Sequence, residues 1–130
     1  MGRRIEWACL ALMLAVSTAR GDSAPSFEDL YGPPIGDAGG LMFELDLDGP
    51  LAVTLGGCVD GQPNCALARS RNLLGMEVVA VDGVELRPEG GFVRQIMRAF
   101  ADEAAGPTIT LELRSRTANG EPIHVDFARR

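Results

Sequence analysis

Apolar and polar side chains alternate along three segments of this chain, in the pattern of strands that bury one face. In the segment 43–48, Phe or Leu occupies every second position and acidic residues occupy the others. The same alternation returns in 108–114 and 123–127. It places one face of each strand on a hydrophobic core and the other in water. Shorter apolar runs predict further strands, at 51–55, 66–68, 76–81 and 84–86.

One segment instead carries the three- and four-residue spacing of an amphipathic helix. Apolar residues recur at that spacing within 91–104, and the charged residues fall elsewhere on the helical wheel. Pro107 ends this helix because its ring cannot continue the hydrogen-bond pattern. Asp82-Gly83 and Asn119-Gly120 are tight-turn signals between strands. The order of elements predicts an α+β, mainly β fold with one main helix.

The N-terminal residues have the features of a secretory signal peptide. Arg3 and Arg4 give a positive start, an apolar run follows over 7–16, and small residues at 17–19 offer a cleavage site. The run is short for a membrane span, which needs about 20 residues. We therefore expect a signal peptide over 1–19 and a protein that is secreted or lies in the lumen of the secretory pathway. An uncleaved anchor and a transit peptide are the alternatives.

The remainder of the chain divides into a lead-in, one domain and a tail. Residues 20–41 are rich in Gly, Pro, Ser and Asp and have few periodic apolar positions, which predicts a flexible lead-in. The periodic segments place a single folded domain over 42–116. Residues 117–130 are expected to form a C-terminal hairpin, strand and tail. A chain of 130 residues has room for one domain of this size once a leader is removed.

Composition and charge narrow the classes of partner. Hydrophobic residues make up 46% of the chain and charged residues 23%, which is typical of a globular protein rather than a disordered one. The formal net charge is −6, and an acidic surface repels phosphate backbones and anionic lipids. We therefore expect no nucleic-acid binding, and no membrane binding after the signal peptide is removed. We expect a monomer that needs no cofactor.

Two cysteines, Cys58 and Cys65, lie in the predicted domain, and the third, Cys9, would leave with the signal peptide. The residues between the two contain Asp-Gly and Pro-Asn pairs, which reverse the chain and allow the two side chains to meet. An exported protein would therefore hold them as a structural disulfide. The alternative is a redox or metal pair, but a zinc site lacks ligands in a chain with one His.

The sequence contains only weak signals of a catalytic site or a metal site. His124 is the one histidine of the chain, and it lies in an alternating strand that points it to solvent. Nucleophilic catalysis needs a positioned base, which this placement does not supply. Asp46 and Asp48 resemble the start of a calcium loop, yet Gly57 stands where that loop needs Glu. We therefore expect no enzymatic activity and no metal site.

Two stretches of the domain resemble the PDZ domain family. Gly75 and Gly83 enclose an apolar strand with the spacing of that family's central strand and turn, and Asp82 replaces the family's Asn. Residues 50–53 look like the loop that binds a peptide carboxylate in the family. The resemblance covers the domain at 42–116. It implies a partly open sandwich or barrel of five to six strands, capped by one main helix.

The resemblance also implies that the domain binds a protein or peptide segment. Backbone amides at 51–53 would hold the ligand's carboxylate, and the ligand would add as a strand beside 51–55. Side chains of the helix would line the other side of the groove. The implied peptide-binding residues are Leu51, Ala52, Val53, Leu55, Phe92 and Ile96, with Met97 beside them.

Other interpretations stay open at this stage. Asp46 and Asp48 lie just before the carboxylate loop and disfavour an anion there. The ligand would then bring positive charge, or Arg69 or Arg71 would cover the site, or no C-terminal peptide would bind. A second hypothesis is a structural or scaffold domain whose groove is occupied by its own side chains or by the strand 123–127. A third is a fragment of a larger secreted protease or processing factor.

Overall fold

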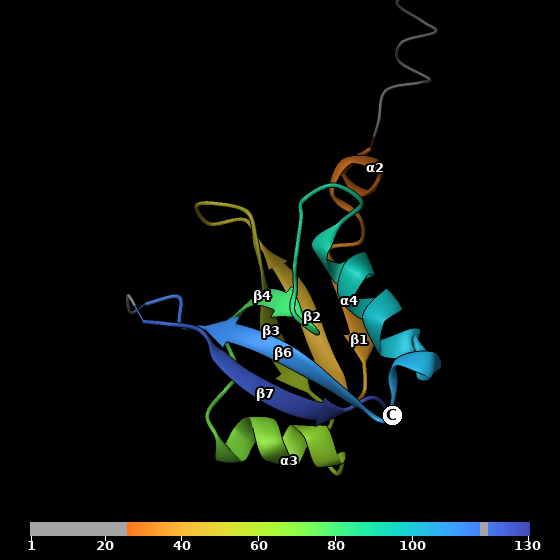
Figure 1. Cartoon of the computed structure of the whole chain (residues 1–130). Helices are drawn as coiled ribbons and strands as arrows, with labels where there is room; N and C mark the ends of the chain where they lie inside the picture. The colour runs from red at the N-terminus through yellow and green to blue at the C-terminus, as the bar shows by residue number, and fades with distance from the viewer. Residues whose placement is uncertain (1–25, 118–119) are drawn as a thin grey trace, which may run out of the picture.

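The structure is a computed structural model of the chain, and it describes residues 26–117 and 120–130. Over these residues seven strands form one open antiparallel sheet, accompanied by three α-helices and a short 3-10 helix (Figure 1). The fold is thus α+β and mainly β, as predicted, with seven strands where the resemblance implied five to six. The strands are β1 (Ile35–Ala38), β2 (Leu41–Asp46), β3 (Ala52–Cys58), β4 (Glu77–Val81), β5 (Val84–Glu85), β6 (Thr108–Arg114) and β7 (Ile123–Ala128). The helices are α2 (Phe27–Tyr31), α3 (Pro63–Ser70), α4 (Phe92–Ala101) and the 3-10 helix η1 (Glu103–Ala105).

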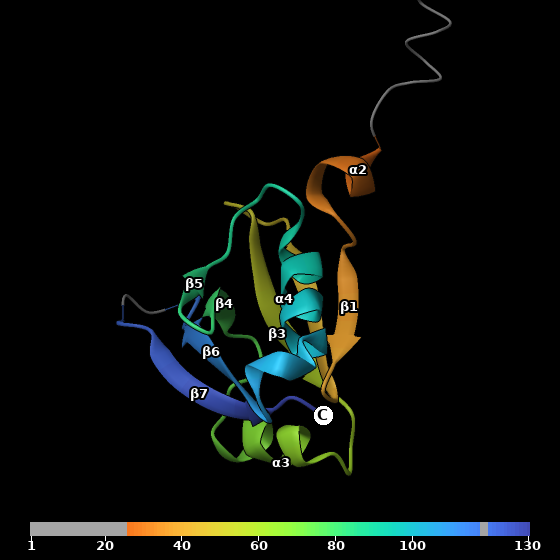
Figure 2. The ribbon, with the colours of Figure 1, turned by 45° about the vertical axis from the view of Figure 1, so that its right-hand side comes forward.

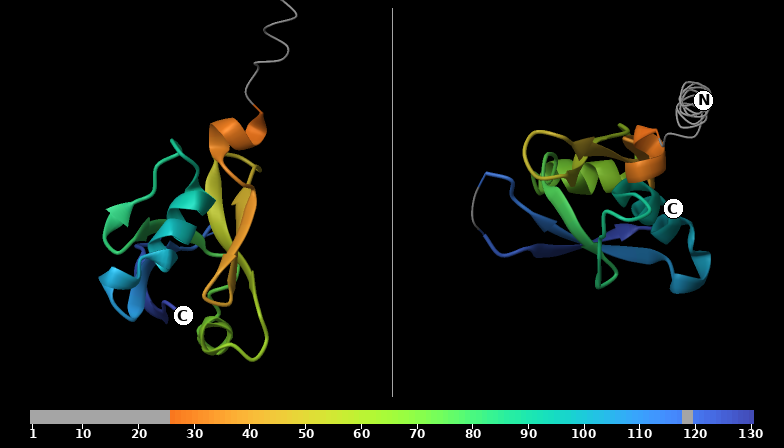
Figure 3. Two further views of the ribbon diagram at one scale, coloured as in Figure 1. Left: turned by 90° about the vertical axis from the view of Figure 1, so that its right-hand side faces the viewer. Right: turned by 90° about the horizontal axis from the view of Figure 1, so that it is seen from above.

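The strands follow one another across the sheet in the order β1, β2, β3, β4, β6, β7, and β5 pairs with β4 beside that path. Each of these pairings is antiparallel. In Figures 1 and 3, β6 and β7 cross the direction of β1, β2 and β3, so the sheet curls around its core. Strand β1 lies at one end of this order and β7 at the other.

Helix α4 packs against the concave side of the curled sheet (Figure 2). Its buried side chains are Val93, Ile96 and Phe100, which recur at the three- and four-residue spacing of the sequence pattern. The Phe100 ring centroid lies 5.9 Å from that of Phe43 on β2. The helix predicted over 91–104 is confirmed, with its last turn tightened into η1.

The segment 66–68, expected as a strand, is part of helix α3. Pro63 occupies the first turn of this helix, where its fixed φ favours helix formation and its missing N–H costs nothing. Ala, Leu and Arg follow, and these residues have high helix propensity. A run of three apolar residues is too short to distinguish the period of a strand from that of a helix, which is why the prediction was wrong.

Strand β3 runs further than expected and passes through Gly56 and Gly57 to Cys58. The strand continues because β2 pairs with it on both sides of Gly56, with Phe43 opposite Leu55 and Met42 opposite Gly57, while Gly56 itself lies at a shift in the register. Pairing to a neighbour has here outweighed the weak strand propensity of glycine.

The range 20–41, predicted as a lead-in, contains helix α2 and strand β1. Strand β1 pairs with β2 over four residues, and it buries no side chain fully. A strand held by backbone pairing leaves no apolar periodicity in the sequence, so the pattern could not reveal it. The predicted signal peptide, 1–19, lies outside the described residues. No helix within the described ranges has the length and apolar character needed to cross a bilayer.

The disulfide predicted between Cys58 and Cys65 is present, and it joins the end of β3 to α3. Replacing both cysteines with serine is expected to lower the free energy of unfolding by about 2 kcal/mol, because the cross-link removes loop entropy from the unfolded chain. Urea denaturation of the oxidised protein, of the reduced protein and of the double variant measures this. Reduction should shift the native protein and leave the variant unchanged. Equal stability of all three would contradict a structural role.

Candidate functional site

The structure brings four of the six predicted peptide-binding residues together. Leu51, Ala52, Val53 and Phe92 line one small cavity of about 140 Å³ between the start of β3, the start of α4 and strands β4 and β5. The other two, Leu55 and Ile96, have no exposed surface and belong to the hydrophobic core. They therefore support the fold and are not available to a ligand in this conformation.

The expected ligand position beside 51–55 is taken by strand β2. Strand β2 pairs with β3 from Ala52 opposite Asp46 to Cys58 opposite Leu41, with one shift of register at Gly56. The other edge of β3 meets β4, where Thr54 lies opposite Glu77. The strand edge predicted to be open at β3 is therefore already paired. Of the strands, β1 packs most extensively against α4.

Strand β1 lies in a slot between β2 and α4 (Figure 2). Its four residues pair with β2, from Ile35 opposite Glu44 to Ala38 opposite Leu41. The Leu45 N–H donates to the Pro34 carbonyl oxygen at 2.8 Å and extends this pairing by one step. Val93 and Met97 of α4 lie over Gly36, on the face of β1 that points to the helix. The domain thus holds an extended segment of its own chain between a strand and a helix.

The segment that contains α2 and β1 is attached with little apolar burial. Ile35 is 58% exposed, and no residue of α2 is buried. The α2 N-terminus is closed by a capping box in which the Ser26 hydroxyl accepts from the Asp29 N–H and the Asp29 carboxylate accepts from the Ser26 N–H. These hydrogen bonds, with a smaller contribution from Arg94, hold the pKa of Asp29 below its ordinary value. Backbone pairing therefore carries most of the attachment.

A group of ion pairs joins the end of β2, the start of β4 and the end of β6. Arg116 contacts Asp46 at 2.7 Å and Glu77 at 3.3 Å, and Arg114 contacts Glu77 at 2.9 Å. The positive charge expected near Asp46 and Asp48 thus comes from Arg116, which also reaches the Asp48 carbonyl oxygen. Arg69 pairs with Asp60 instead. A groove of about 810 Å³ passes over these groups and over 50–52.

Two buried polar residues escaped the sequence analysis. The Arg129 side chain is only 3% exposed and donates to carbonyl oxygens of Gly106 and Thr108 and to the Asp82 carboxylate. Asn64 is buried on α3, and its side chain accepts from the Ala128 N–H and donates to the Ala128 carbonyl oxygen. Nothing in the local pattern marks either residue, since an Arg near a terminus and an Asn in a turn-rich stretch are usually exposed.

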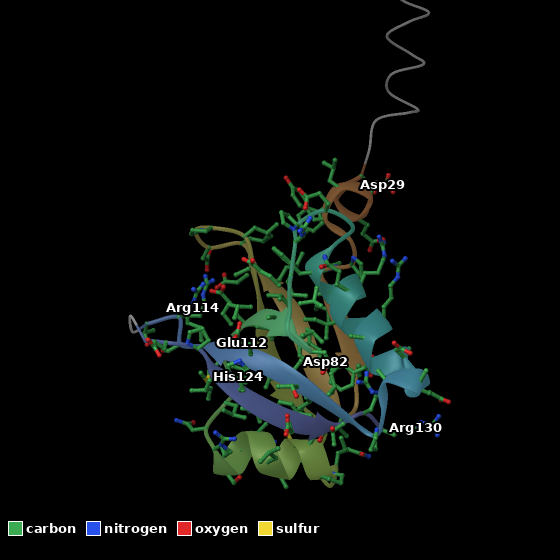
Figure 4. All side chains as sticks on the ribbon, in the orientation of Figure 1. Asp29, Asp82, Glu112, Arg114, His124 and Arg130 are labelled. Atoms are coloured by element: carbon green, nitrogen blue, oxygen red, sulfur yellow. A yellow bond between two sulfur atoms is a disulfide. The ribbon has the colours of Figure 1, made fainter. Side chains whose placement is uncertain are left out.

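Among residues 26–117 and 120–130, titratable groups form pairs at the surface of the protein. The His124 side chain is largely exposed on β7, and its Nε2 lies 2.8 Å from Glu112 on β6 (Figure 4). The described residues contain no group of three or more His, Cys, Asp or Glu side chains placed to hold a metal ion.

Comparison with protein-family models, with curated proteins and with solved structures finds no match to the chain.

Proposed function

We propose that this domain binds an extended segment of another protein by strand addition to β2, alongside α4. The observation that carries the proposal is the position of β1, which lies extended in that slot with its backbone paired to β2. Strand addition of this kind takes affinity from main-chain hydrogen bonds and selectivity from the side chains that line the slot. The role is one of recognition, with no chemical step.

The shape of the slot supports this role. The β2 strand is anchored in the core by Leu41 and Phe43, which have no exposed surface. Helix α4 is anchored in the same core by Val93 and Ile96. A strand edge and a helix that are both held rigidly form a slot that needs no rearrangement of its own walls, which lowers the entropic cost of binding. The segment that occupies the slot has, in contrast, few buried contacts of its own.

The proposed function is of the kind that the PDZ resemblance implies, but the ligand would pair with β2 instead of β3. Residues 51–53 lie outside the slot, at the cavity shared with Phe92. The resemblance itself stays a prediction. The alternative is a structural domain in which β1 fills the slot permanently, and the observed pairing of β1 with β2 is the feature that favours it.

Selection of extended peptides from a display library on the intact, oxidised chain, followed by titration monitored by NMR, tests the proposal. We expect selected peptides to bind at sub-millimolar concentration and to shift the amide signals of β2 and α4. Met97→Ala removes a side chain that faces the slot and should weaken binding by about 1 kcal/mol, or roughly fivefold. Arg98→Ala changes the next, exposed residue of α4 and should leave binding unchanged.

Two results would contradict strand addition at β2. One is the failure of every selected peptide to bind the intact chain, which would leave the structural alternative. The other is binding that shifts the signals of 50–52 and 114–116 but not those of β2, which would move the site to the groove above the ion pairs.

A further inference from the structure

The side chains of β1 alternate between solvent and helix. Ile35 and Asp37 are exposed, whereas Gly36 and Ala38 are partly covered. The covered pair, glycine and alanine, are the two smallest amino acids, and both face the side on which α4 lies. The slot therefore holds a strand with small residues at two positions, two residues apart, facing the helix.

Steric contact explains why the first of these positions holds glycine. A β-carbon added to Gly36 would lie 2.5 Å from the Met97 sulfur and 2.6 Å from a Val93 methyl carbon. Met97 is partly exposed and can change rotamer. Val93 has no exposed surface and is packed in the core, so it cannot give way without disturbing its neighbours. The space between α4 and the bound strand thus limits the size of the side chain that can face it.

A second close contact fastens the segment at the start of α4. A β-carbon on Gly32 would lie 2.9 Å from the Gly91 α-carbon, and one on Gly91 would lie 2.7 Å from the Tyr31 carbonyl oxygen. Both glycines have positive φ, at 77° and 87°, which other residues rarely adopt. The backbones before β1 and before α4 therefore touch directly. Segment 33–38 leaves this contact and runs along α4 towards Phe100.

We infer that the slot selects extended segments that present glycine or alanine at two alternate positions towards α4, and that residues 33–38 are its tethered competitor. This inference rests on the proposed function and names the chemistry of its ligand. A segment tethered by a short linker acts at an effective concentration on the order of 1 mM, so an external ligand must compete against it. Weakening the hold of β1 should then raise the apparent affinity for an external strand.

The test compares the native chain with Gly36→Leu and Asp37→Leu. Both place leucine in β1, but only the first faces Val93 and Met97, because Asp37 is exposed on the opposite side. The probe is a synthetic peptide with the sequence of residues 33–40, blocked at both ends and labelled for fluorescence anisotropy. A second peptide carries leucine at the position of Gly36. Circular dichroism and the retained disulfide establish that each variant is folded.

We expect the first peptide to bind Gly36→Leu at least about tenfold more tightly than it binds the native chain or Asp37→Leu. The leucine-containing peptide should bind none of the three proteins. In the native chain, hydrogen exchange at β1 should be faster than at β4 and β6, and the first peptide in excess should accelerate it further.

The failure of this inference and the failure of the proposed function are distinguishable. Equal binding of the first peptide to all three proteins, or binding of the leucine-containing peptide, would overturn the selection for small residues. If excess peptide leaves hydrogen exchange at β1 of the native chain unchanged, the competition is overturned. This measurement does not need the Gly36→Leu variant, so it holds even if that variant does not fold. Binding of library peptides in any of these cases would leave the proposed function intact. Binding of the 33–40 peptide alone, with no library peptide, would support the inference and overturn recognition of other proteins.

Discussion

Replacing Arg129 with methionine is expected to lower the free energy of unfolding by about 3 kcal/mol. The side chain is almost fully buried and donates to four acceptors: the carbonyl oxygens of Ala99, Gly106 and Thr108 and the carboxylate of Asp82. It thereby ties the C-terminal end of the chain to α4, to the start of β6 and to the turn after β4. Methionine fills a similar volume but leaves these acceptors without their donor. Asp82 is partly exposed and can take water instead, so the partly buried hydrogen bonds to the carbonyl groups carry most of the loss. Urea denaturation at neutral pH measures the change.

Two matched variants separate this network from a general effect of charge. Arg130→Met removes the neighbouring guanidinium, which is well exposed and pairs with exposed Glu103, so its effect should stay within about 0.5 kcal/mol. Arg129→Lys keeps the charge but cannot match the fork of donors, and it should lie between the two. Equal destabilisation by Arg129→Met and Arg130→Met would show that the buried hydrogen bonds do not stabilise the fold.

The sequence predicted those elements whose side chains are sorted by burial. Strands β6 and β7 and helix α4 each put apolar residues on one face only, and their positions were predicted to within a few residues. Helix α3 was missed because its sequence gave no such face, with Asn64, Cys65 and Ala68 as its buried residues. Strand β1 was missed because glycine and alanine hold its inner positions. Pairing through the backbone does not require apolar side chains, so a strand held in this way shows no hydropathy pattern in the sequence.

The sequence predicted neither which strand lies beside α4 nor which residues face it. The sequence indicated a strand beside α4, and the structure puts β1 and β2 in that place. The residues expected to bind a ligand divide between a small cavity and the core, because β3 lies one strand further from the helix than the resemblance implied. Local patterns predict strands, whereas the neighbours of a strand depend on segments distant in sequence. A segment that occupies its own domain's slot is therefore the hardest part to predict.

Asn64→Asp is expected to lower the free energy of unfolding by about 3 kcal/mol at neutral pH, through the replacement of one atom. The Asn64 amide nitrogen donates to the carbonyl oxygens of Gly39 and Ala128, each at 2.8 Å, and the side-chain oxygen accepts from the Ala128 N–H at 2.8 Å. A carboxylate at this buried position keeps the last bond but turns a charged oxygen towards two carbonyl oxygens. The connection from α3 to the β1–β2 turn is then broken, and the connection to the end of β7 loses one of its two hydrogen bonds.

The effect should depend on pH, with a sign that follows from the same contacts. Burial and the two facing carbonyl groups disfavour the ionised form, so the pKa of the new carboxyl group in the folded protein lies above the ordinary Asp value of about 3.9. The proton supplies a donor, so the stabilisation is complete below the ordinary pKa and is lost as pH rises through the folded pKa. Urea denaturation at pH 4 and pH 7 should therefore show a smaller difference between native and variant at the lower pH.

Asn72→Asp, the same change at an exposed turn residue, should show neither the loss nor this pH dependence. A difference that stays constant with pH would mean that Asn64 contributes through packing rather than through its donated hydrogen bonds.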